Sequence, residues 1–322
     1  TTGDSNVAVG YLAVGGTGVV TGDNNTGVGA SAGLRITSGA NNTAIGFESL
    51  LANTTGAENV AVGYLSLDAN TTASSCTAVG SNALGSNTTG ALNTAVGSSA
   101  LANNTTGASN VAMGFATLQL NTTGASNTAY GYAAMNANTT GANNVAMGFG
   151  ALDANTTASN NTAVGYNSLT ANTTGAENVA MGALALDAST TGNGNTGLGY
   201  KAISSDTKGS RNTAIGHESL ANQNFTSATD TYNVAIGFHA GYTTTTGTHN
   251  TLIGGLAGDA NTTGYYNVAV GASALSANTT AISNTAVGYN SLGANTTGAN
   301  NVAIGKDALD SNTTGGTNVA IG

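Results

Sequence analysis

The stretch NTAVGYNSLTANTTGAE, residues 161–177, is one of a series of near copies that occupies most of the chain. Positions 1 to 17 of a copy are numbered from its first residue. The copies begin at residues 6, 25, 42, 59, 76, 93, 110, 127, 144, 161, 178, 195, 212, 233, 250, 267, 284, 301 and 318. The period is 17, except that the first copy is two residues longer and the copy starting at Asn212 is four residues longer. Such regular spacing indicates that each copy forms one coil stacked on its neighbours.

The composition excludes several classes of protein. The chain has 322 residues, 6% of them charged, with 48 Gly, no Pro and no Trp. Large apolar residues are scarce, so any hydrophobic core must be thin. Five basic residues against fourteen acidic ones give a net charge of −9, which argues against binding nucleic acid or an anionic membrane. Since no apolar run approaches the roughly 18–20 residues of a membrane span, we expect no membrane insertion.

The register of the repeat argues against disorder, which the composition alone would permit. Position 5 is Gly in all nineteen copies, and position 4 is always apolar. A disordered segment has no need to keep such positions fixed. We therefore expect an ordered repeat.

The residue types within a copy predict strands and turns. Positions 1 to 5 alternate between β-branched or apolar residues and Ala or Gly, as in NTAVG, which is a strand pattern. A second short strand is predicted at positions 7 to 10, and the ANTTG that follows is typical of a turn. A helix is disfavoured because the fixed Gly alone would cost about 1 kcal/mol per copy. The prediction is an all-β fold, a parallel β-solenoid of about nineteen 17-residue coils forming a single domain over residues 1–322.

Stacked coils place the same position of every copy in one column. Position 1 is Asn in every copy but one, where it is Cys76, and a column of Asn side chains can form an amide ladder. The Ala and Gly of positions 3 and 5 give one smooth strand surface, which a second sheet can approach closely. That sheet is either the opposite side of the same coil or a second solenoid.

The NVAIG and NTAVG units resemble the head repeats of trimeric autotransporter adhesins, and they are similar to repeats of predicted phage and viral tail fibres. The resemblance covers residues 6–322 and implies a left-handed parallel β-roll. The period of 17 departs from the shorter coils common in adhesin heads. The residues that carry the resemblance, 6–322, include no segment that resembles the coiled-coil stalk or the membrane barrel of that family.

Twelve Asn residues at position 12 precede Thr-Thr and are therefore candidate glycosylation acceptors. We expect them to lie in exposed turns, where they either carry glycans or simply favour the turn. They are Asn53, Asn70, Asn87, Asn104, Asn121, Asn138, Asn155, Asn172, Asn261, Asn278, Asn295 and Asn312.

Position 6 holds ten of the sixteen Tyr and Phe residues. Such a column is either a platform for sugars or a neighbouring chain, or an internal packing ladder. Because small residues interrupt it without a pattern, we favour internal packing. The aromatic members are Tyr11, Phe47, Tyr64, Phe115, Tyr132, Phe149, Tyr166, Tyr200, Phe238 and Tyr289.

Motifs for catalysis are weak. GNGNTG at residues 192–197 fits G-x-G-x-x-G, but the repeat register explains it. His217, His239 and His249 are close in sequence and occupy positions 6, 7 and 17 of their copies. Side chains at positions 6 and 7 should face opposite ways across a strand, so we expect the three His residues to face solvent and to share no metal ion. No pair recurs as nucleophile and base. We expect no enzymatic activity and no cofactor.

Residues 198–266 are the least repetitive part and contain the four-residue insertion near 223–231. Loops on a rigid scaffold often carry recognition, so a ligand loop is expected here if the chain has one. A tolerated insertion is the alternative. The candidate ligand residues are Gln223, Asn224, Phe225, Asp230 and Tyr232.

These observations favour a non-enzymatic extracellular fibre, either an adhesin-like shaft or a filament subunit, exposed on a cell or virion surface. Its partner would be itself, as an end-to-end filament or a homotrimer. The alternative is a segment that binds a host-surface glycan or protein, as in a tail fibre. Ice binding is disfavoured because adjacent Thr residues in a turn point apart. Because the sequence pattern predicts a turn at Thr1 and a strand residue at Gly322, and neither is typical of a cap, we expect both ends to be joined to further structure.

Overall fold

The structure, a computed structural model, describes residues 2–16 and 18–322. In these residues every regular element is a β-strand, and no helix is present that could cross a membrane. The chain divides into two compact units, Thr1–Asn160 and Asn161–Gly322.

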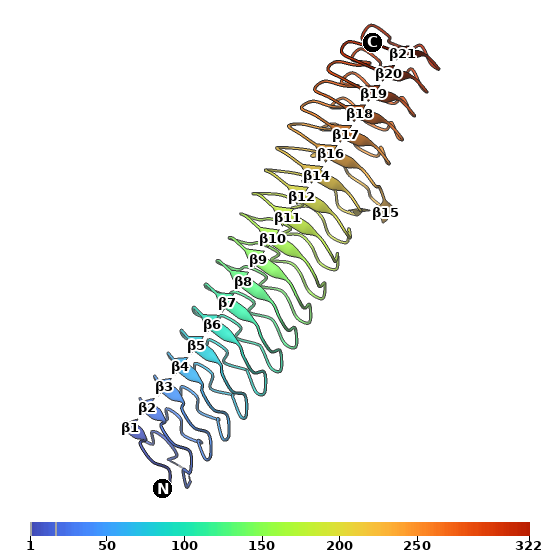
Figure 1. Cartoon of the computed structure of the whole chain (residues 1–322). Coiled ribbons are helices and arrows are strands. Elements are labelled where there is room, and N and C mark those ends of the chain that lie inside the picture. Colours follow the sequence, from blue (N-terminus) through green and yellow to red (C-terminus); the bar gives the residue numbers. More distant parts are fainter. Residues whose placement is uncertain (1, 17) are drawn as a thin grey trace. The chain divides into compact units, whose positions relative to one another are not determined.

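Each coil contributes one short strand to a parallel stack, as Figure 1 shows within each unit. The first unit contains β1 (Val7–Val9), β2 (Thr26–Val28), β3 (Thr43–Ile45), β4 (Val60–Val62), β5 (Thr77–Val79), β6 (Thr94–Val96), β7 (Val111–Met113), β8 (Thr128–Tyr130) and β9 (Val145–Met147). The second contains β10 (Thr162–Val164), β11 (Val179–Met181), β12 (Thr196–Leu198), β13 (Gly209–Ser210), β14 (Thr213–Ile215), β15 (Thr229–Asp230), β16 (Val234–Ile236), β17 (Thr251–Ile253), β18 (Val268–Val270), β19 (Thr285–Val287), β20 (Val302–Ile304) and β21 (Val319–Ile321).

The register of the strands matches the register of the repeat. In the first unit Thr43 pairs with Val60 and Ala44 with Ala61, so equal positions of consecutive copies lie side by side. The same parallel pairing joins β14 to β16 across the four-residue insertion. The parallel β-solenoid with a 17-residue coil is thereby confirmed. Its left hand stays a prediction from the resemblance.

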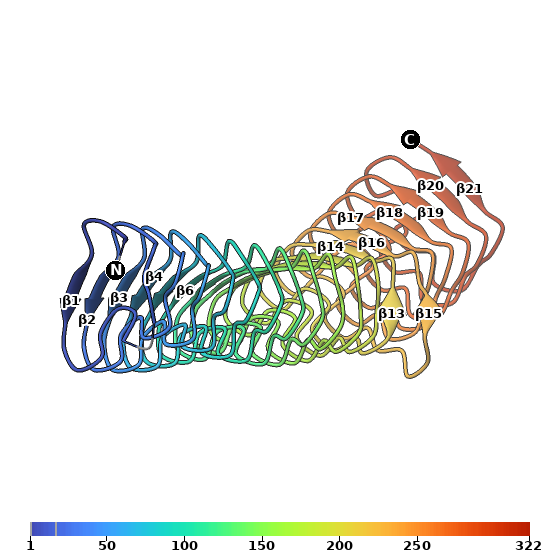
Figure 2. The same cartoon turned by 90° about the horizontal axis from the view of Figure 1, so that it is seen from below.

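The insertion adds a second, smaller parallel sheet. β13 pairs with β15, with Gly209 opposite Thr229. Figure 2 shows these two strands on a different side of the coil from β14 and β16. The extra residues therefore extend the coil outward while the main stack keeps its register.

The core of the coil is one layer of small residues against one column of Leu. The Ala at position 3 points inward and is buried, as for Ala61, and so is Leu67 at position 9. The smooth Ala surface thus faces the opposite side of its own coil. The Gly at position 5 is required because Gly63 has a φ of +136°, and a Cβ there would lie 2.5 Å from the Gly80 carbonyl oxygen of the next coil.

The predicted second strand at positions 7 to 10 was wrong. This segment forms a series of turns, and positions 7 and 9 have positive φ, for example 53° at Leu65 and 52° at Leu67. Positive φ is incompatible with a strand. Alternating residue size in this segment therefore reflects a tightly wound turn region that also places one large side chain in the core.

Two columns of Asn side chains form hydrogen-bonded ladders inside the coil. At position 1, Asn59 Nδ2 donates to Asn42 Oδ1 of the preceding coil at 3.0 Å. At position 12, Asn70 Nδ2 donates to Asn53 Oδ1 at 2.8 Å. The Asn side chains of both ladders also donate to the backbone carbonyl at position 15 of their own coil. Asn42 Nδ2 and Asn53 Nδ2 each donate to the Gly56 carbonyl oxygen at 2.9 Å. The ladders thus tie each coil to itself and to its neighbour.

The position 12 ladder corrects the prediction that the candidate glycosylation residues are exposed. The turn is present, but the Asn side chains point into the coil, because Nδ2 is used in hydrogen bonds along the ladder and to position 15. Eleven of them are buried, with 0–1% of their surface exposed. Only Asn312, in the last complete coil, is partly exposed. The buried residues are Asn53, Asn70, Asn87, Asn104, Asn121, Asn138, Asn155, Asn172, Asn261, Asn278 and Asn295. The folded coil offers no access to an attached glycan at these atoms.

Candidate functional site

The side chains at strand positions 2 and 4 point outward, opposite to the buried Ala between them. In β7, Met113 is 37% exposed while Ala112 is fully buried. In β9, Met147 is 41% exposed. We call positions 2 and 4, together with the position 6 column beside them, the strand face. It is present in both units.

The aromatic column at position 6 belongs to this outward face, so the prediction of internal packing was wrong. Phe115, Tyr132 and Phe149 are 50–53% exposed in the first unit, and Phe238 and Tyr289 are 53% and 56% exposed in the second. The Gly at position 5 turns the chain so that the next side chain stays outside the coil. A signal for this exposure was present in the sequence, because Lys306 and His217 occupy the same column.

Neighbouring rings of the column stack on each other. Phe115 and Tyr132 have centroids 5.3 Å apart with 16° between their planes, and Tyr132 and Phe149 have centroids 5.2 Å apart with 7° between their planes. Phe47 and Tyr64 stack at 5.7 Å. Such stacks contribute about 0.5–1.5 kcal/mol per pair beyond the buried area. They also cover the ring faces of Tyr132, so this residue presents its ring edge and hydroxyl to solvent.

The strand face is almost free of charge. None of the fourteen Asp and Glu residues lies at position 2, 4 or 6, and the only basic side chains in these columns are His217 and Lys306. The net charge of −9 is therefore carried by other surfaces of the coil.

The candidate ligand loop is divided between core and surface. Gln223 and Phe225 are buried, with 0% and 7% exposed. Gln223 occupies position 12 and donates Nε2 to Asp206 Oδ2 at 2.6 Å, while its Oε1 accepts from Asn233 Nδ2 at 2.9 Å. Gln223 and Asp206, which both occupy position 12, thus continue the interior ladder. Asn224 is exposed.

Asp230 and Tyr232 lie on the surface, where Arg211 holds them. Arg211 forms an ion pair with Asp230 and donates Nη1 to the Tyr232 hydroxyl at 2.8 Å. The His249 ring packs in a tilted arrangement against Tyr232 and Tyr266, with centroids 5.3 Å and 5.0 Å apart. The insertion is therefore anchored by a column of its own at the last position of the coil.

His217 and His239 lie on the same side of the coil, so the prediction that they face apart was wrong. The positive φ of 54° at both Glu218 and His239 turns position 7 toward the position 6 column. Glu218 Oε2 lies 2.9 Å from His239 Nε2 and 3.9 Å from His217 Nδ1. His217 is half exposed, as expected, and His239 is less exposed. The strand alternation used for the sequence prediction does not extend past position 5.

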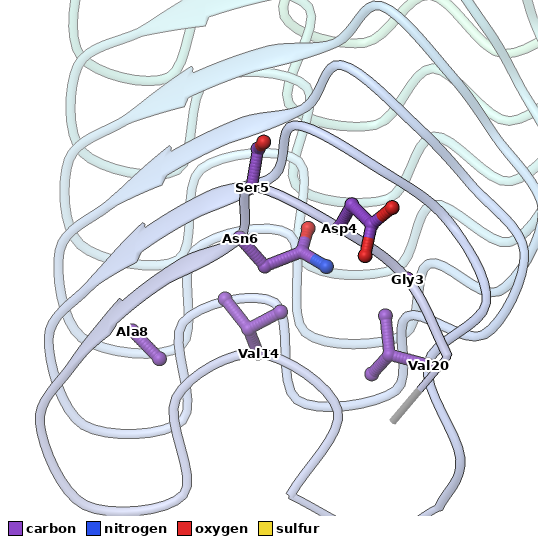
Figure 3. Close-up of a pocket in the computed structure, with 7 residues that line it drawn as sticks. All are labelled: Gly3, Asp4, Ser5, Asn6, Ala8, Val14 and Val20. Atoms are coloured by element: carbon purple, nitrogen blue, oxygen red, sulfur yellow. The ribbon is translucent and has the colours of Figure 1, made fainter.

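A hollow at the first coil is lined by Gly3, Asp4, Ser5, Asn6, Ala8, Val14 and Val20. Figure 3 shows Asn6, Val14 and Val20 directed into it. Ala8 is exposed here, whereas Ala44 at the same position of a later coil is buried. The hollow is thus the end of the interior columns, and its residue types are those of the core.

Four carboxyl groups at position 10 are half-buried. Burial raises the pKa of Asp68, Asp153, Asp187 and Asp259 above the ordinary value of 3.8. Asp187 and Asp259 each have a buried Oδ1 that accepts no hydrogen bond from the described residues. The column therefore holds carboxylates that are poorly compensated when ionised.

Comparisons with protein-family models, with curated proteins and with solved structures found no match to this chain.

Proposed function

We propose that the chain is a non-enzymatic structural fibre segment that self-associates side by side through the strand face. The observation that carries the proposal is the outward row of aliphatic side chains, Thr and stacked aromatic rings, which contains no acidic residue. Contiguous exposed apolar surface of this kind marks an interaction site. An extracellular, adhesin-like shaft is the setting we propose for such a fibre.

A second copy of the chain is the partner that fits this face best. Its own strand face has the same axial repeat, set by the strand spacing of about 4.8 Å, so rows of side chains can interdigitate along the whole contact. Two chains of net charge −9 repel each other on most surfaces. The strand face carries no acidic residue, so contact there brings the fewest like charges together.

Sugar binding is the less favoured function for this column. Aromatic residues that bind sugars offer a free ring face on which the pyranose ring stacks. Both faces of Tyr132 are covered by Phe115 and Phe149. At Tyr132 a sugar would therefore have to break two existing stacks to reach a ring face.

Sedimentation equilibrium tests the proposal. The unaltered chain is expected to exceed its monomer mass of 30.9 kDa, with an apparent mass that rises with concentration. The variant Phe115→Ser, Tyr132→Ser, Phe149→Ser is expected to sediment as a monomer. Ser is a suitable replacement because Ser81 and Ser98 already occupy position 6.

The matched control places three substitutions on another exposed column, Thr106→Ala, Thr123→Ala and Thr140→Ala. It is expected to associate as the unaltered chain does. A monomeric unaltered chain at every concentration would refute self-association. Equal loss in both triple variants would refute the assignment to the strand face.

A further inference from the structure

Three potential metal ligands converge where the coil that carries the insertion meets the next coil. They belong to His217, Glu218 and His239, each of which has a ligand atom within 4.8 Å of those of the other two. The group uses two of the three His residues of the chain. Its members come from positions 6 and 7 of two successive coils, so the solenoid winding and not sequence adjacency brings His239 to the other two.

We propose that these three side chains form a zinc site that clamps the coil of residues 212–232 to the coil of residues 233–249. Zinc bonds to nitrogen and oxygen are about 2.0–2.2 Å long, so ligand atoms around a tetrahedral ion are separated by about 3.3 Å. The distances of 2.9 Å and 3.9 Å from Glu218 Oε2 to the two imidazoles bracket this value. Small side-chain rotations suffice to close the set around an ion.

The donor set selects the metal. Two imidazole nitrogens and one carboxylate match zinc and its neighbours in the first transition row, whereas Ca²⁺ and Mg²⁺ prefer all-oxygen sites. Three protein ligands leave a fourth position for water or for a side chain of another molecule.

The surrounding residues hold the two imidazoles in place. His239 lies between Phe238, at 3.9 Å between ring centroids, and Tyr242, at 4.6 Å. His217 lies between Tyr200 and Phe238, at 5.2 Å and 5.5 Å. The His239 backbone N–H also donates to the His217 carbonyl at 3.0 Å, which fixes the two coils relative to each other at the site. A rigid surrounding shell of this kind reduces the entropy lost on metal binding.

The clamp would act at the most irregular point of the second unit. The coil that begins at Asn212 is four residues longer than the regular coil, and its extra residues include the exposed segment 226–228. A metal that binds only the folded pair of coils stabilises that pair by mass action. This inference is independent of the proposed self-association, because it concerns contacts within one chain.

Isothermal titration with ZnCl₂ tests the site on the metal-free full chain. One zinc ion is expected to bind per chain. Three variants borrow residues found at the same positions of other copies: His217→Phe, Glu218→Ser and His239→Asn. Each is expected to weaken binding by more than about tenfold, because loss of even an outer-shell partner of a metal ligand typically costs about 10- to 100-fold in affinity.

His249→Ala is the matched control, since it removes the third His of the chain while leaving the cluster intact, and its zinc affinity is expected to equal that of the unaltered chain. Circular dichroism confirms that each variant is folded. Zinc X-ray absorption should show two imidazoles. The proposal fails if the unaltered chain binds no zinc, which would leave only a hydrogen bond between Glu218 and His239. It also fails if His249→Ala weakens binding as much as the three ligand variants do.

Discussion

Leu67 and its counterparts at position 9 combine burial with positive φ. Leu67 has a φ of 52° and is fully buried. The left-handed conformation costs a residue with a Cβ about 1–2 kcal/mol, and burying a Leu side chain contributes about 1.5–3 kcal/mol. The burial offsets the strain, so a large apolar residue is retained where Gly or Asn would relax the backbone.

Cys76 interrupts the position 1 ladder and gives a residue-scale prediction. Its backbone N–H still donates to Asn59 Oδ1, and its Sγ lies 3.3 Å from the Gly90 carbonyl oxygen. It has no amide oxygen to accept from Asn93. Cys76→Asn is expected to restore the missing hydrogen bonds and to raise the free energy of unfolding by about 1–2 kcal/mol. Chemical denaturation measures this value.

The control for that substitution is Cys76→Ala, which removes the thiol without adding an amide. It is expected to be neutral or destabilising. A destabilised Cys76→Asn protein would show that the local coil is not equivalent to the others, against the ladder interpretation.

The half-buried carboxyls at position 10 predict an unusual pH dependence. Because burial raises the folded-state pKa of Asp68, Asp153 and Asp187 above 3.8, the folded chain binds their protons more tightly than the unfolded chain does. Their contribution to stability is therefore greatest below 3.8 and is lost as the pH rises through the folded-state pKa. The melting temperature is expected to rise as the pH is lowered from neutral toward about 4.

Asp153→Asn tests which group is responsible, and Asn136 already occupies the same position of the preceding copy. The variant is expected to melt higher than the unaltered chain at neutral pH and to show a smaller rise on acidification. Thermal melts followed by circular dichroism give both quantities. A melting temperature that falls steadily from neutral pH to pH 4, by the same amount in both proteins, would count against this assignment.

At the scale of the coil, the sequence predicts the strand and its register, but it does not predict the backbone conformation of the turn segment that follows. The strand at positions 2 to 4 and its register follow from the alternation in NTAVG and from the period. The turn segment at positions 6 to 10 does not, since Leu50 or Leu67 in an alternating context is typical of a strand. The direction of each side chain after Gly at position 5 depends on its φ near +130°, which residue type alone does not reveal.

The same limit explains the outcome at the candidate sites. The sequons predicted a turn correctly, but the inward direction of Asn53 and its counterparts required the ladder. One sequence signal was available: Ile36 replaces Asn at position 12, and an isoleucine favours an interior column. His217 and His239 converge only because positive φ at position 7 breaks the strand alternation.

In one pair of neighbouring coils, a larger side chain at position 3 fills the space left by smaller residues at position 9. Leu252 replaces Ala at position 3 and is 1% exposed, while the flanking position 9 residues are Gly241 and Gly258. A Cβ at either Gly would lie 2.7 Å from a Leu252 methyl. Leu252→Ala is expected to leave a cavity and to lower the free energy of unfolding by about 2–5 kcal/mol.

Gly241→Leu should rescue that loss, because it restores the regular pairing of Ala at position 3 with Leu at position 9, as at Leu220. In the unaltered background Gly241→Leu is expected to destabilise by overpacking, about 1–3 kcal/mol. The double variant is therefore expected to be more stable than the sum of the two single changes predicts. Additive losses in this double-mutant cycle would show that the two positions do not share one space.

At the scale of the whole molecule, charge and apolar surface are kept apart. The acidic residues lie outside the strand face, and the stacked aromatic column lies on it. Each coil offers only a few apolar side chains, so the contact it can make is weak. A partner with the same period contacts many coils at once, so the weak contacts add up to a stronger association. This is the reason for proposing self-association instead of a single local binding site.

The most direct test of the strand face as the contact between copies is the labelling rate of a single cysteine placed on it. In a Cys76→Ser background, Met147→Cys puts a thiol on the face and Thr123→Cys puts one on an exposed turn. A bulky maleimide is expected to label the Met147→Cys chain progressively more slowly as protein concentration rises, while Thr123→Cys labels at a constant rate. Rates that are independent of concentration at both positions would contradict the account.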